Sequence, residues 1–269
     1  MSPTARVLGA GVLALVAAAR LRADDGRPPI LRGVAFEQRI GQQVPLDLEL
    51  RDETGRPVRL GEYFGRKPVL LVPAYYQCPM LCTLVLNGVV SALRALSFDV
   101  GKEFTVVTFS FNPRESSELA AATQEKYLGE YRRPGAAAGW HFLTAGEEPI
   151  RQLTEAIGFR YAYDAAHDQF AHAAGIVVLT PEGTISRYFY GVEFAPRDLR
   201  LALVEASEHR LGSLVDQLLL FCFHYDPATG RYSTLALGAV RWAGLATVLG
   251  LAGGVLLMLR REARGVRAG

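Results

Sequence analysis

Two continuous apolar runs, each followed by a helical segment, most constrain how this chain can fold. The runs are residues 68–76 (PVLLVPAYY) and 104–111 (FTVVTFSF), and neither contains a charged residue. Such runs are typical of strands that are buried on both faces. Residues 81–96 and 115–131, which follow them, are predicted to be helices. Strands that alternate with helices in this way indicate a parallel arrangement with helices packed on the sheet.

The rest of the central region completes an α/β domain. Further strands are predicted at residues 44–50, 57–60, 140–143, 176–179 and 185–190, and further helices at 150–157 and 199–211. Pro73 should lie at a bulge, because a central strand needs the N–H that proline lacks. The order of the elements predicts a thioredoxin-like, three-layer α/β sandwich over residues 40–212, after a linker at residues 24–39.

The first 23 residues have the character of a secretory signal. After Arg6, residues 7–19 are all apolar or small. This stretch is too short to span a bilayer, which takes about 20 residues of helix. A short apolar core behind a positive start is typical of an export signal. The sequence leaves open whether residues 1–23 are removed.

The opposite end predicts a membrane anchor. Residues 242–259 carry no charge and are long enough to span a bilayer, and four arginines follow in the last ten residues. Because basic residues favour the cytoplasmic side, we expect a transmembrane helix at 241–260 with a cytoplasmic tail at 261–269. A juxtamembrane segment at 213–240 would connect the helix to the domain. The domain would then face the outer, periplasmic side of a bacterial inner membrane, anchored by a single pass.

The formal net charge of +2 hides an uneven distribution. Eight of the 29 Lys and Arg residues, but only one of the 27 acids, lie outside residues 23–240. The middle of the chain therefore keeps 21 basic and 26 acidic residues, a net charge of −5. This body lacks the basic surface that nucleic-acid binding requires, so no nucleic-acid partner is expected.

The chemistry of the chain centres on Cys78 and Cys82, which lie in YYQCPMLC at the predicted strand-to-helix turn. A helix N-terminus stabilises negative charge, so we expect it to lower the pKa of these thiols. The CxxxC spacing lets two thiolates converge on one soft cation, such as Cu(I), or close a disulfide. The alternative without function is a pair of core cysteines or an inert disulfide.

Related sites fit the cysteine pair less well. Thiol oxidoreductases of the thioredoxin type use CxxC, which is one residue shorter. The dinuclear copper centre of oxidase subunits has a histidine four residues after the second cysteine, and Leu86 stands there. Structural zinc requires four protein ligands, and this motif supplies two.

A histidine would complete a two-thiolate copper site, and the chain has five. His172 is favoured, because in a thioredoxin-like layout the loop that enters the strand at 176–179 lies beside the cysteine turn. His141 begins a strand and is expected to pack, and His209 is expected on a solvated helix face. His167, five residues before His172, is the fallback.

The segment Tyr76–Cys82 (YQCPMLC), with His172 ahead of residues 177–183 (VVLTPEG), resembles the Sco/SenC family over roughly residues 40–208. This resemblance implies a membrane-anchored, thioredoxin-like protein that binds copper through two cysteines and one histidine. Such proteins serve assembly of the dinuclear copper centre of cytochrome c oxidase, as copper donors, thiol reductants or both. The implied ligands are Cys78, Cys82 and His172.

Several positions depart from the family pattern. Thr83 stands where the family often has proline, and Ala171 where it often has aspartate before the histidine. The family's D-P-x-R-D turn becomes NPRES at residues 112–116. Many members carry an N-terminal anchor, whereas this chain has the features of a C-terminal one.

A second small cluster, Cys222 and His224, lies in the juxtamembrane segment. These residues could capture or relay copper, or the thiol could resolve a mixed disulfide. The alternative is a plain linker with a single cysteine.

The leading hypothesis is a copper metallochaperone that transfers copper to the copper-bearing subunit of cytochrome c oxidase or to another copper chaperone. The main alternative is a thiol-disulfide oxidoreductase acting on exported cysteine pairs, in which Cys78 attacks and Cys82 resolves. A third hypothesis is a copper or redox sensor that signals through the membrane helix.

Overall fold

The computed structural model describes residues 29–78 and 81–208, together with short pieces between residues 225 and 251. The predicted signal-like segment at 1–23, the cysteine-histidine cluster at 222–224 and the tail at 261–269 lie outside the described residues, as does most of the predicted helix at 241–260. Within the part of the chain that is described, no helix is both long and apolar enough to cross a membrane.

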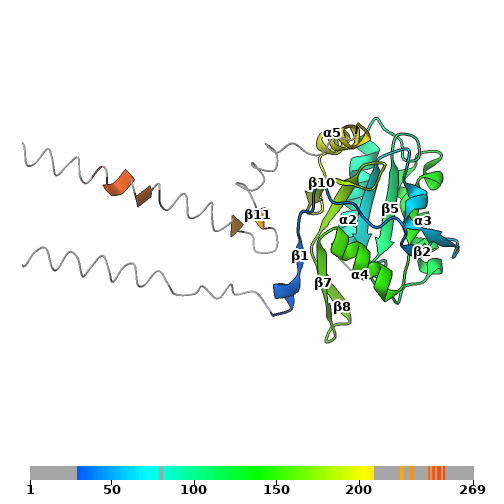
Figure 1. Ribbon diagram of the computed structural model, residues 1–269, viewed down its shortest axis with the longest axis horizontal. Helices are drawn as coiled ribbons and strands as arrows, with labels where there is room; N and C mark the ends of the chain where they lie inside the picture. The colour runs from blue at the N-terminus through cyan, green and yellow to red at the C-terminus, as the bar shows by residue number, and fades with distance from the viewer. Residues whose placement is uncertain are drawn as a thin grey trace, which may run out of the picture.

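A five-stranded sheet forms the centre of the domain (Figure 1). Its strands, in spatial order, are β10 (Ile185–Tyr190), β9 (Gly175–Leu179), β4 (Val69–Ala74), β5 (Thr105–Ser110) and β6 (Trp140–Leu143). β4, β5 and β6 are parallel, whereas β9 and β10 run antiparallel to their neighbours. Every residue of β4 and β9 is buried, as the apolar runs require.

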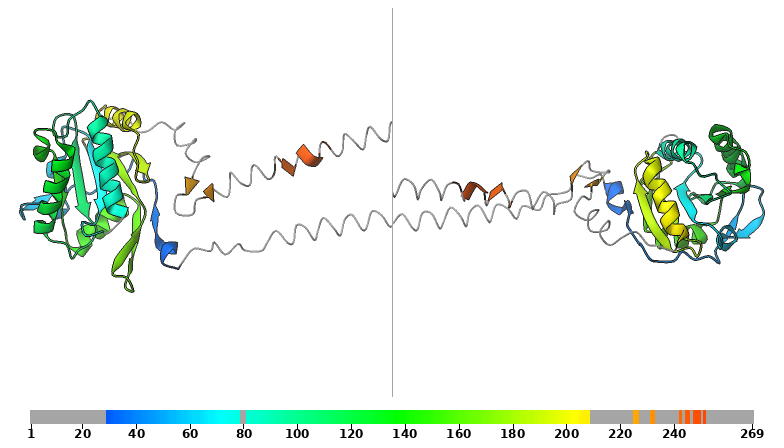
Figure 2. Two further views of the ribbon diagram at one scale, coloured as in Figure 1. Left: turned by 180° about the vertical axis from the view of Figure 1, so that it is seen from behind. Right: turned by 90° about the horizontal axis from the view of Figure 1, so that it is seen from above.

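Helices cover both faces of this sheet. They are α2 (Leu81–Ala95), α3 (Ser117–Tyr131), α4 (Glu147–Ala156) and α5 (Pro196–Ser207). α2 contacts both α3 and α5. In the view from behind, α2 and α3 lie in front of the sheet (Figure 2). α4 lies on the opposite face (Figure 1). The predicted thioredoxin-like, three-layer α/β domain is confirmed.

Pro73 fits its strand without the expected bulge. β4 keeps a regular register with β5 through Pro73, which pairs with Phe109. β9 pairs with β4 only from Val69 to Leu71, so Pro73 lies beyond the part of β4 that is flanked on both sides. The prediction of a bulge was therefore wrong.

The sequence analysis began the first strand too early, whereas the strand predicted at 57–60 is present. Of the strand predicted at 44–50, only β2 (Glu49–Arg51) forms, and it pairs with β3 (Pro57–Arg59). Val44 and Leu48 are buried and Leu46 is partly buried without forming a strand, and their alternation gave the false signal. Short 3-10 helices occur at Pro29–Gly33, Leu60–Tyr63 and Ala136–Ala138. Two isolated strands, β11 (Tyr225–Asp226) and β12 (Arg231–Tyr232), pair with each other.

A second sheet, which the sequence analysis missed, carries one side of the candidate site. It contains β1 (Ala35–Phe36), β7 (Phe159–Asp164) and β8 (Gln169–His172), all antiparallel. β7 and β8 form a hairpin in which Tyr161 lies opposite His172. His172 is thus the last residue of a hairpin strand, rather than part of a loop that enters β9.

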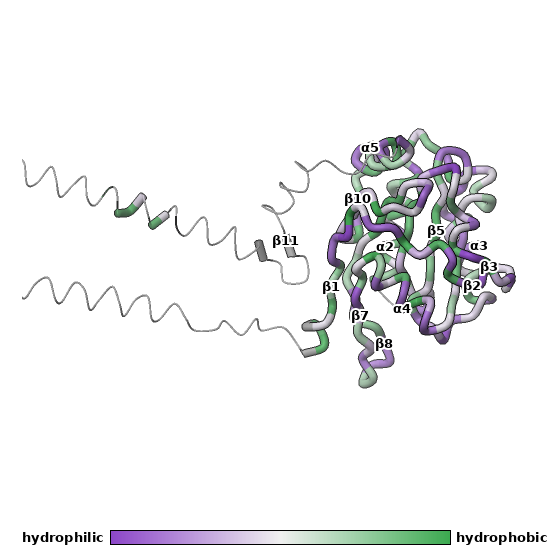
Figure 3. Tube along the Cα trace, in the orientation of Figure 1, coloured by the Kyte–Doolittle hydropathy of each residue, from purple (hydrophilic) through white to green (hydrophobic). Residues whose placement is uncertain are grey.

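Hydrophobic residues concentrate along the central strands and α2 (Figure 3). The largest fully buried side chains include Trp140, Phe104, Phe109, Phe111 and Phe159. α2 buries Cys82 on the same face as Val85, Leu86 and Val89. The second cysteine is therefore built into the core, and its position is fixed by the packing of the helix.

Gly88 allows α2 to approach the loop after β10. A Cβ at Gly88 would lie 1.8 Å from the carbonyl oxygen of Val192, so Gly88→Ala must displace the helix or the loop. We expect a loss of roughly 1–3 kcal/mol in the free energy of unfolding, measured by urea denaturation. The matched control is Gly129→Ala in α3, where a Cβ meets no atom within 4 Å, and it should stabilise the protein by up to about 1 kcal/mol. Equal stabilities of the two variants would contradict this packing.

Candidate metal centre

Three chain segments bring Cys78, Cys82 and His172 together. Cys78 follows β4, Cys82 is the second residue of α2, and His172 ends β8. The Sγ atom of Cys82 lies 3.2 Å from Nε2 of His172. One ligand atom from each residue can be chosen so that all three lie within 4.8 Å of one another. The two cysteines are not joined by a disulfide in the structure.

Backbone amides around the turn point at the two sulfurs. The N–H of Cys82 donates to Cys78 Sγ at 3.3 Å, so this sulfur caps the first turn of α2. The N–H of Tyr75 donates to Cys82 Sγ, also at 3.3 Å. Thr83, where the family often has proline, donates its hydroxyl to the carbonyl of Cys78 at 3.2 Å. These contacts fix both sulfurs relative to β4 and α2.

A buried carboxylate holds the strand end just before Cys78. Glu115 accepts hydrogen bonds from the backbone N–H groups of Tyr76 and Gln77, both at 2.8 Å, and from the Ser110 hydroxyl at 2.5 Å. The sequence analysis assigned Glu115 no role. The sequence did contain a hint of this role. Glu115 lies in the loop after β5, and β5 ends on the same side of the sheet as its parallel neighbour β4.

The ring of His172 sits among aromatic side chains and has a defined orientation. Its centroid lies 5.1 Å from that of Phe111 and 6.0 Å from those of Tyr75 and Phe159. Nδ1 lies 2.9 Å from the carbonyl oxygen of Ala173, which can only accept, so Nδ1 carries the proton. In the neutral ring, Nε2 then keeps its lone pair, which faces Cys82. This carbonyl takes the place of a carboxylate that would orient the ring.

The tip of the β7–β8 hairpin is tied to the loop that carries Glu115. Arg114 forms an ion pair with Asp168 at 3.0 Å, and its guanidinium lies 5.1 Å from the centroid of the Tyr163 ring. The Tyr163 hydroxyl donates to the same carboxylate at 2.6 Å. Neighbouring residues of one loop thus contact both the cysteine side and the histidine side of the site.

Burial raises the pKa of the Cys82 thiol well above its usual value, and the neighbouring Cys78 adds to the shift. Cys82 is only 1% exposed. The expectation that the helix N-terminus lowers this pKa was wrong for Cys82, because the loss of solvation outweighs the favourable helix end. Metal binding to this thiol must therefore release a proton. Burial also raises the pKa of Tyr75, so its hydroxyl keeps its proton.

The other histidines have different surroundings. The ring of His141 packs on Tyr63 with centroids 4.6 Å apart, as expected for a packed residue, and its Nδ1 lies 3.4 Å from Glu53. His167, the fallback ligand, is exposed near the hairpin tip and contacts Asp164. His209 lies outside the described residues. In the described part of the chain, no second group of His, Cys, Asp or Glu side chains could hold a metal ion.

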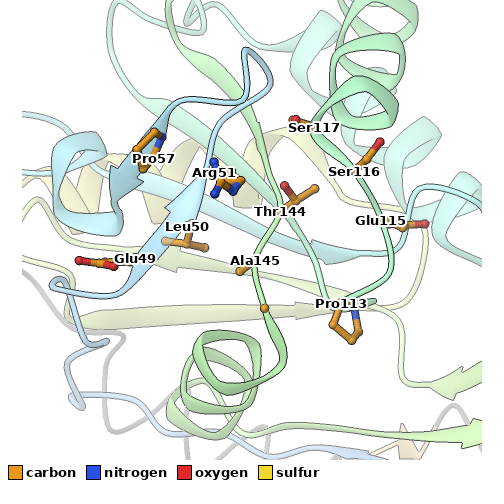
Figure 4. A pocket seen from close by; sticks show the side chains of 11 residues that line it. Glu49, Leu50, Arg51, Pro57, Pro113, Glu115, Ser116, Ser117, Thr144 and Ala145 are labelled. Atoms are coloured by element: carbon orange, nitrogen blue, oxygen red, sulfur yellow. The ribbon is translucent and has the colours of Figure 1, made fainter.

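A pocket of about 450 Å³ lies apart from these three residues (Figure 4). β2, the start of α3 and the turn after β6 line it. It shares only Pro113, Glu115 and Ser116 with the loop after β5 and contains neither cysteine nor His172. Donor atoms, rather than pocket volume, therefore identify the candidate site.

A sequence model described as SCO1/SenC matches residues 37–205. The chain belongs to the SCO1/SenC family. This family is known in copper binding and in cytochrome c oxidase assembly. No curated protein matches the chain.

The chain is also similar to several solved structures. A protein from Aquifex aeolicus VF5, described provisionally as an electron transfer protein, is 31% identical, covers 65% of this chain and 98% of its own, and has a TM-score of 0.56. A SCO1/SenC family lipoprotein from Bacillus anthracis str. Ames is 14% identical over 64% of this chain and 99% of its own, with a TM-score of 0.52. Arabidopsis thaliana ScoI, solved with copper bound, is 17% identical over 63% and 99%, with a TM-score of 0.49.

The role of Glu115 can be tested with an isosteric change. Glu115→Gln replaces one acceptor oxygen by an NH₂ group, so one backbone N–H near Cys78 loses its partner. We expect a loss of about 1–3 kcal/mol in the free energy of unfolding, measured by chemical denaturation. Glu125→Gln, on the exposed side of α3, should change stability by less than about 0.5 kcal/mol. Wild-type stability of Glu115→Gln would show that the carboxylate does not hold this strand end.

The raised pKa of Cys82 predicts a pH-dependent stability for the reduced, metal-free protein. The folded state holds the thiol proton more tightly than the unfolded state, so this contribution is complete below the unfolded pKa of about 8.5. As the pH rises above that value, the free energy of unfolding should fall by up to about 1.4 kcal/mol per pH unit. Urea denaturation from pH 7.5 to 9.5 measures the slope. Cys82→Ala should flatten it, and parallel curves for the two proteins would contradict the assignment.

Proposed function

We propose that this protein is a copper metallochaperone whose ligands are Cys78, Cys82 and His172. The observation that carries the proposal is the 3.2 Å approach of His172 Nε2 to Cys82 Sγ. These atoms come from residues 90 positions apart, one in helix α2 and the other at the end of strand β8 in the second sheet. Close packing of a thiol against an unprotonated imidazole nitrogen, with a second thiol beside them, favours a soft metal ion.

The donor set suits copper and its transfer. Two thiolates and one imidazole select a soft ion over hard cations such as Mg²⁺ or Ca²⁺. Binding would release the protons of both thiols, while Nε2 of His172 already offers a lone pair. Three protein donors leave room for an incoming ligand, whereas a closed four-ligand site would retain the ion. Copper would therefore leave by ligand exchange, in which each new thiolate bond replaces one from this site.

The acceptor that fits this chemistry is the copper-bearing subunit of cytochrome c oxidase, or another copper chaperone. Membership of a family known in oxidase assembly supports this acceptor. In this proposal residues 1–23 direct export, and a helix at 241–260 anchors the domain on the periplasmic side of a bacterial inner membrane. The described residues between 242 and 251 are helical, and large apolar side chains such as Trp242 and Leu251 are exposed, which supports contact with lipid.

A thiol-disulfide oxidoreductase is the second candidate. Cys78 is 8% exposed and Cys82 only 1%, which favours Cys78 as the attacking sulfur and Cys82 as the resolving one. The provisional description of the 31% identical Aquifex aeolicus protein as an electron transfer protein is also in keeping with a redox role. This function needs no metal and does not involve His172.

A copper titration tests the proposal. The reduced full chain, in a Cys222→Ser background, is titrated with Cu(I) against a chromophoric chelator. We expect one copper ion per chain. Cys78→Ala and His172→Ala should each weaken binding by more than about 100-fold, because even residues that only support metal ligands contribute 10–100-fold.

His167→Ala is the matched control, because it removes an exposed histidine from the same hairpin and should leave copper affinity unchanged. Unchanged affinity in His172→Ala would remove this histidine from the site. A wild-type protein that binds no copper but reduces disulfide substrates, with His172→Ala equally active, would instead establish the oxidoreductase.

A further inference from the structure

Glu115 is a buried carboxylate that faces the cysteine turn. The residue is only 7% exposed. Its Oε1 accepts from the backbone N–H of Gln77, and its Oε2 accepts from the backbone N–H of Tyr76 and from the Ser110 hydroxyl. All three contacts are donated to the carboxylate, which is the pattern that an ionised carboxylate satisfies. Its negative charge therefore lies against the residue that directly precedes Cys78.

No cation pairs with this carboxylate within the described part of the chain. There, no lysine, arginine or histidine nitrogen lies within 4.0 Å of the Glu115 oxygens. Arg114, the neighbour in sequence, pairs with Asp168 at 3.0 Å instead. Hydrogen bonds from neutral donors stabilise the charged form of a carboxylate and leave its net charge in place. The candidate site thus has a fixed negative charge beside it that belongs to none of its three ligands.

The charge of the bound ion decides how this carboxylate affects the filled site. Binding releases the protons of both thiols, so Cys78 and Cys82 contribute two negative charges, while His172 stays neutral. With Cu(I) the filled site keeps one negative charge, whereas with a divalent ion such as Zn²⁺ it is neutral. A negative charge nearby repels the first complex and not the second. The raised pKa of Cys82, caused first by burial and then by Cys78, also has a contribution from the charge of Glu115.

We propose that Glu115 is a positioning residue whose charge lowers the affinity of the site for Cu(I) relative to a divalent ion. Through two backbone N–H groups it fixes the strand end before Cys78, and through its charge it weakens the hold on Cu(I). A weaker hold favours release of Cu(I) to the thiolates of an acceptor. The inference rests on the proposed function, because it assigns a residue that controls how firmly the proposed cargo is retained.

The test compares the affinities of wild type and Glu115→Gln for Cu(I) and for Zn²⁺. The full chain carries Cys222→Ser and is kept reduced, and each ion is titrated against a chromophoric chelator. Only binding that Cys78→Ala abolishes is counted. The ratio of the two affinities is the informative quantity. Loss of the charge also eases the ionisation of both thiols, but this effect is the same for the two ions and cancels in the ratio.

Two further variants separate the charge from its structural role. Ser110→Ala is the matched control, because it removes the 2.5 Å hydrogen bond to Glu115 and keeps the charge. Any loosening of the turn in this variant should affect both ions alike. Asn112→Asp adds a negative charge to the same loop, at a residue that is 6% exposed. Its Oδ1 accepts from the N–H of Arg114 at 3.1 Å, a contact that aspartate can keep.

For Glu115→Gln we expect the affinity for Cu(I) relative to Zn²⁺ to rise about tenfold, as removal of one buried charge near the ion requires. Ser110→Ala should keep the wild-type ratio, and Asn112→Asp should lower it. A wild-type ratio in Glu115→Gln, or an equal rise in Ser110→Ala, would overturn the inference. If Glu115→Gln does not fold, an unchanged ratio in Asn112→Asp would overturn it.

The same titrations distinguish this inference from the proposed function. A wild type that binds Cu(I), with an unchanged ratio in Glu115→Gln, would refute the role of Glu115 and leave the metallochaperone in place. A wild type that binds Zn²⁺ but not Cu(I) would refute the proposed function. In that case, Cu(I) binding that appears only in Glu115→Gln would still support the effect of the charge, and its absence from both proteins would refute that effect as well.

Discussion

The candidate site depends on how a small hairpin sheet is held against the central sheet. Cys78 follows strand β4 of the central sheet and Cys82 lies in helix α2, whereas His172 ends β8 of the β1-β7-β8 sheet. Only Ala173 and Ala174 separate β8 from β9, so the chain joins the two sheets at one point next to the site. A small rotation of the hairpin about this point would move the imidazole away from Cys82. The distance of 3.2 Å between Cys82 Sγ and His172 Nε2 therefore depends on all the contacts that hold the hairpin in place.

Two kinds of contact share that task. Rings from the strands and loops of both sheets pack together at centroid distances of 4.9–5.8 Å, with Phe111 in contact with Phe159, Tyr161 and Phe170. Each such pair contributes about 0.5–1.5 kcal/mol beyond the burial of its area. The Arg114–Asp168 pair is exposed, so solvent screens it and it contributes little to stability. The aromatic cluster therefore holds the hairpin in place, while the polar groups of Tyr75, Glu115 and Ala173 set the direction of the donor atoms.

The sequence predicted the central sheet well because its strands are continuous apolar runs with helices between them. It missed β7 and β8 because these strands are largely half-exposed and polar residues interrupt them, so no continuous buried run marks them. His172 was nevertheless selected, since its place ahead of the β9 strand survives the error in local structure. Glu115 and Tyr75 could not be assigned roles, because their partners lie far away in the sequence or act through backbone atoms. The pKa of Cys82 was misjudged because the helix position was visible in the sequence and the burial was not.

The difference in burial between the two cysteines indicates from which side a partner can reach the candidate site. Cys82 is sealed beneath the first turn of α2, whereas Cys78 lies nearer the surface, so an approaching thiolate reaches the site from the Cys78 side. In the proposed copper transfer Cys78 would be the first ligand to be exchanged, and in disulfide exchange it would be the sulfur that attacks the partner's disulfide. The greater exposure of Cys78 would therefore suit the first step of both reactions. They would diverge at His172, which could offer Nε2 to a bound cation but has no sulfur to exchange, and its close approach to Cys82 is the reason to propose metal transfer first.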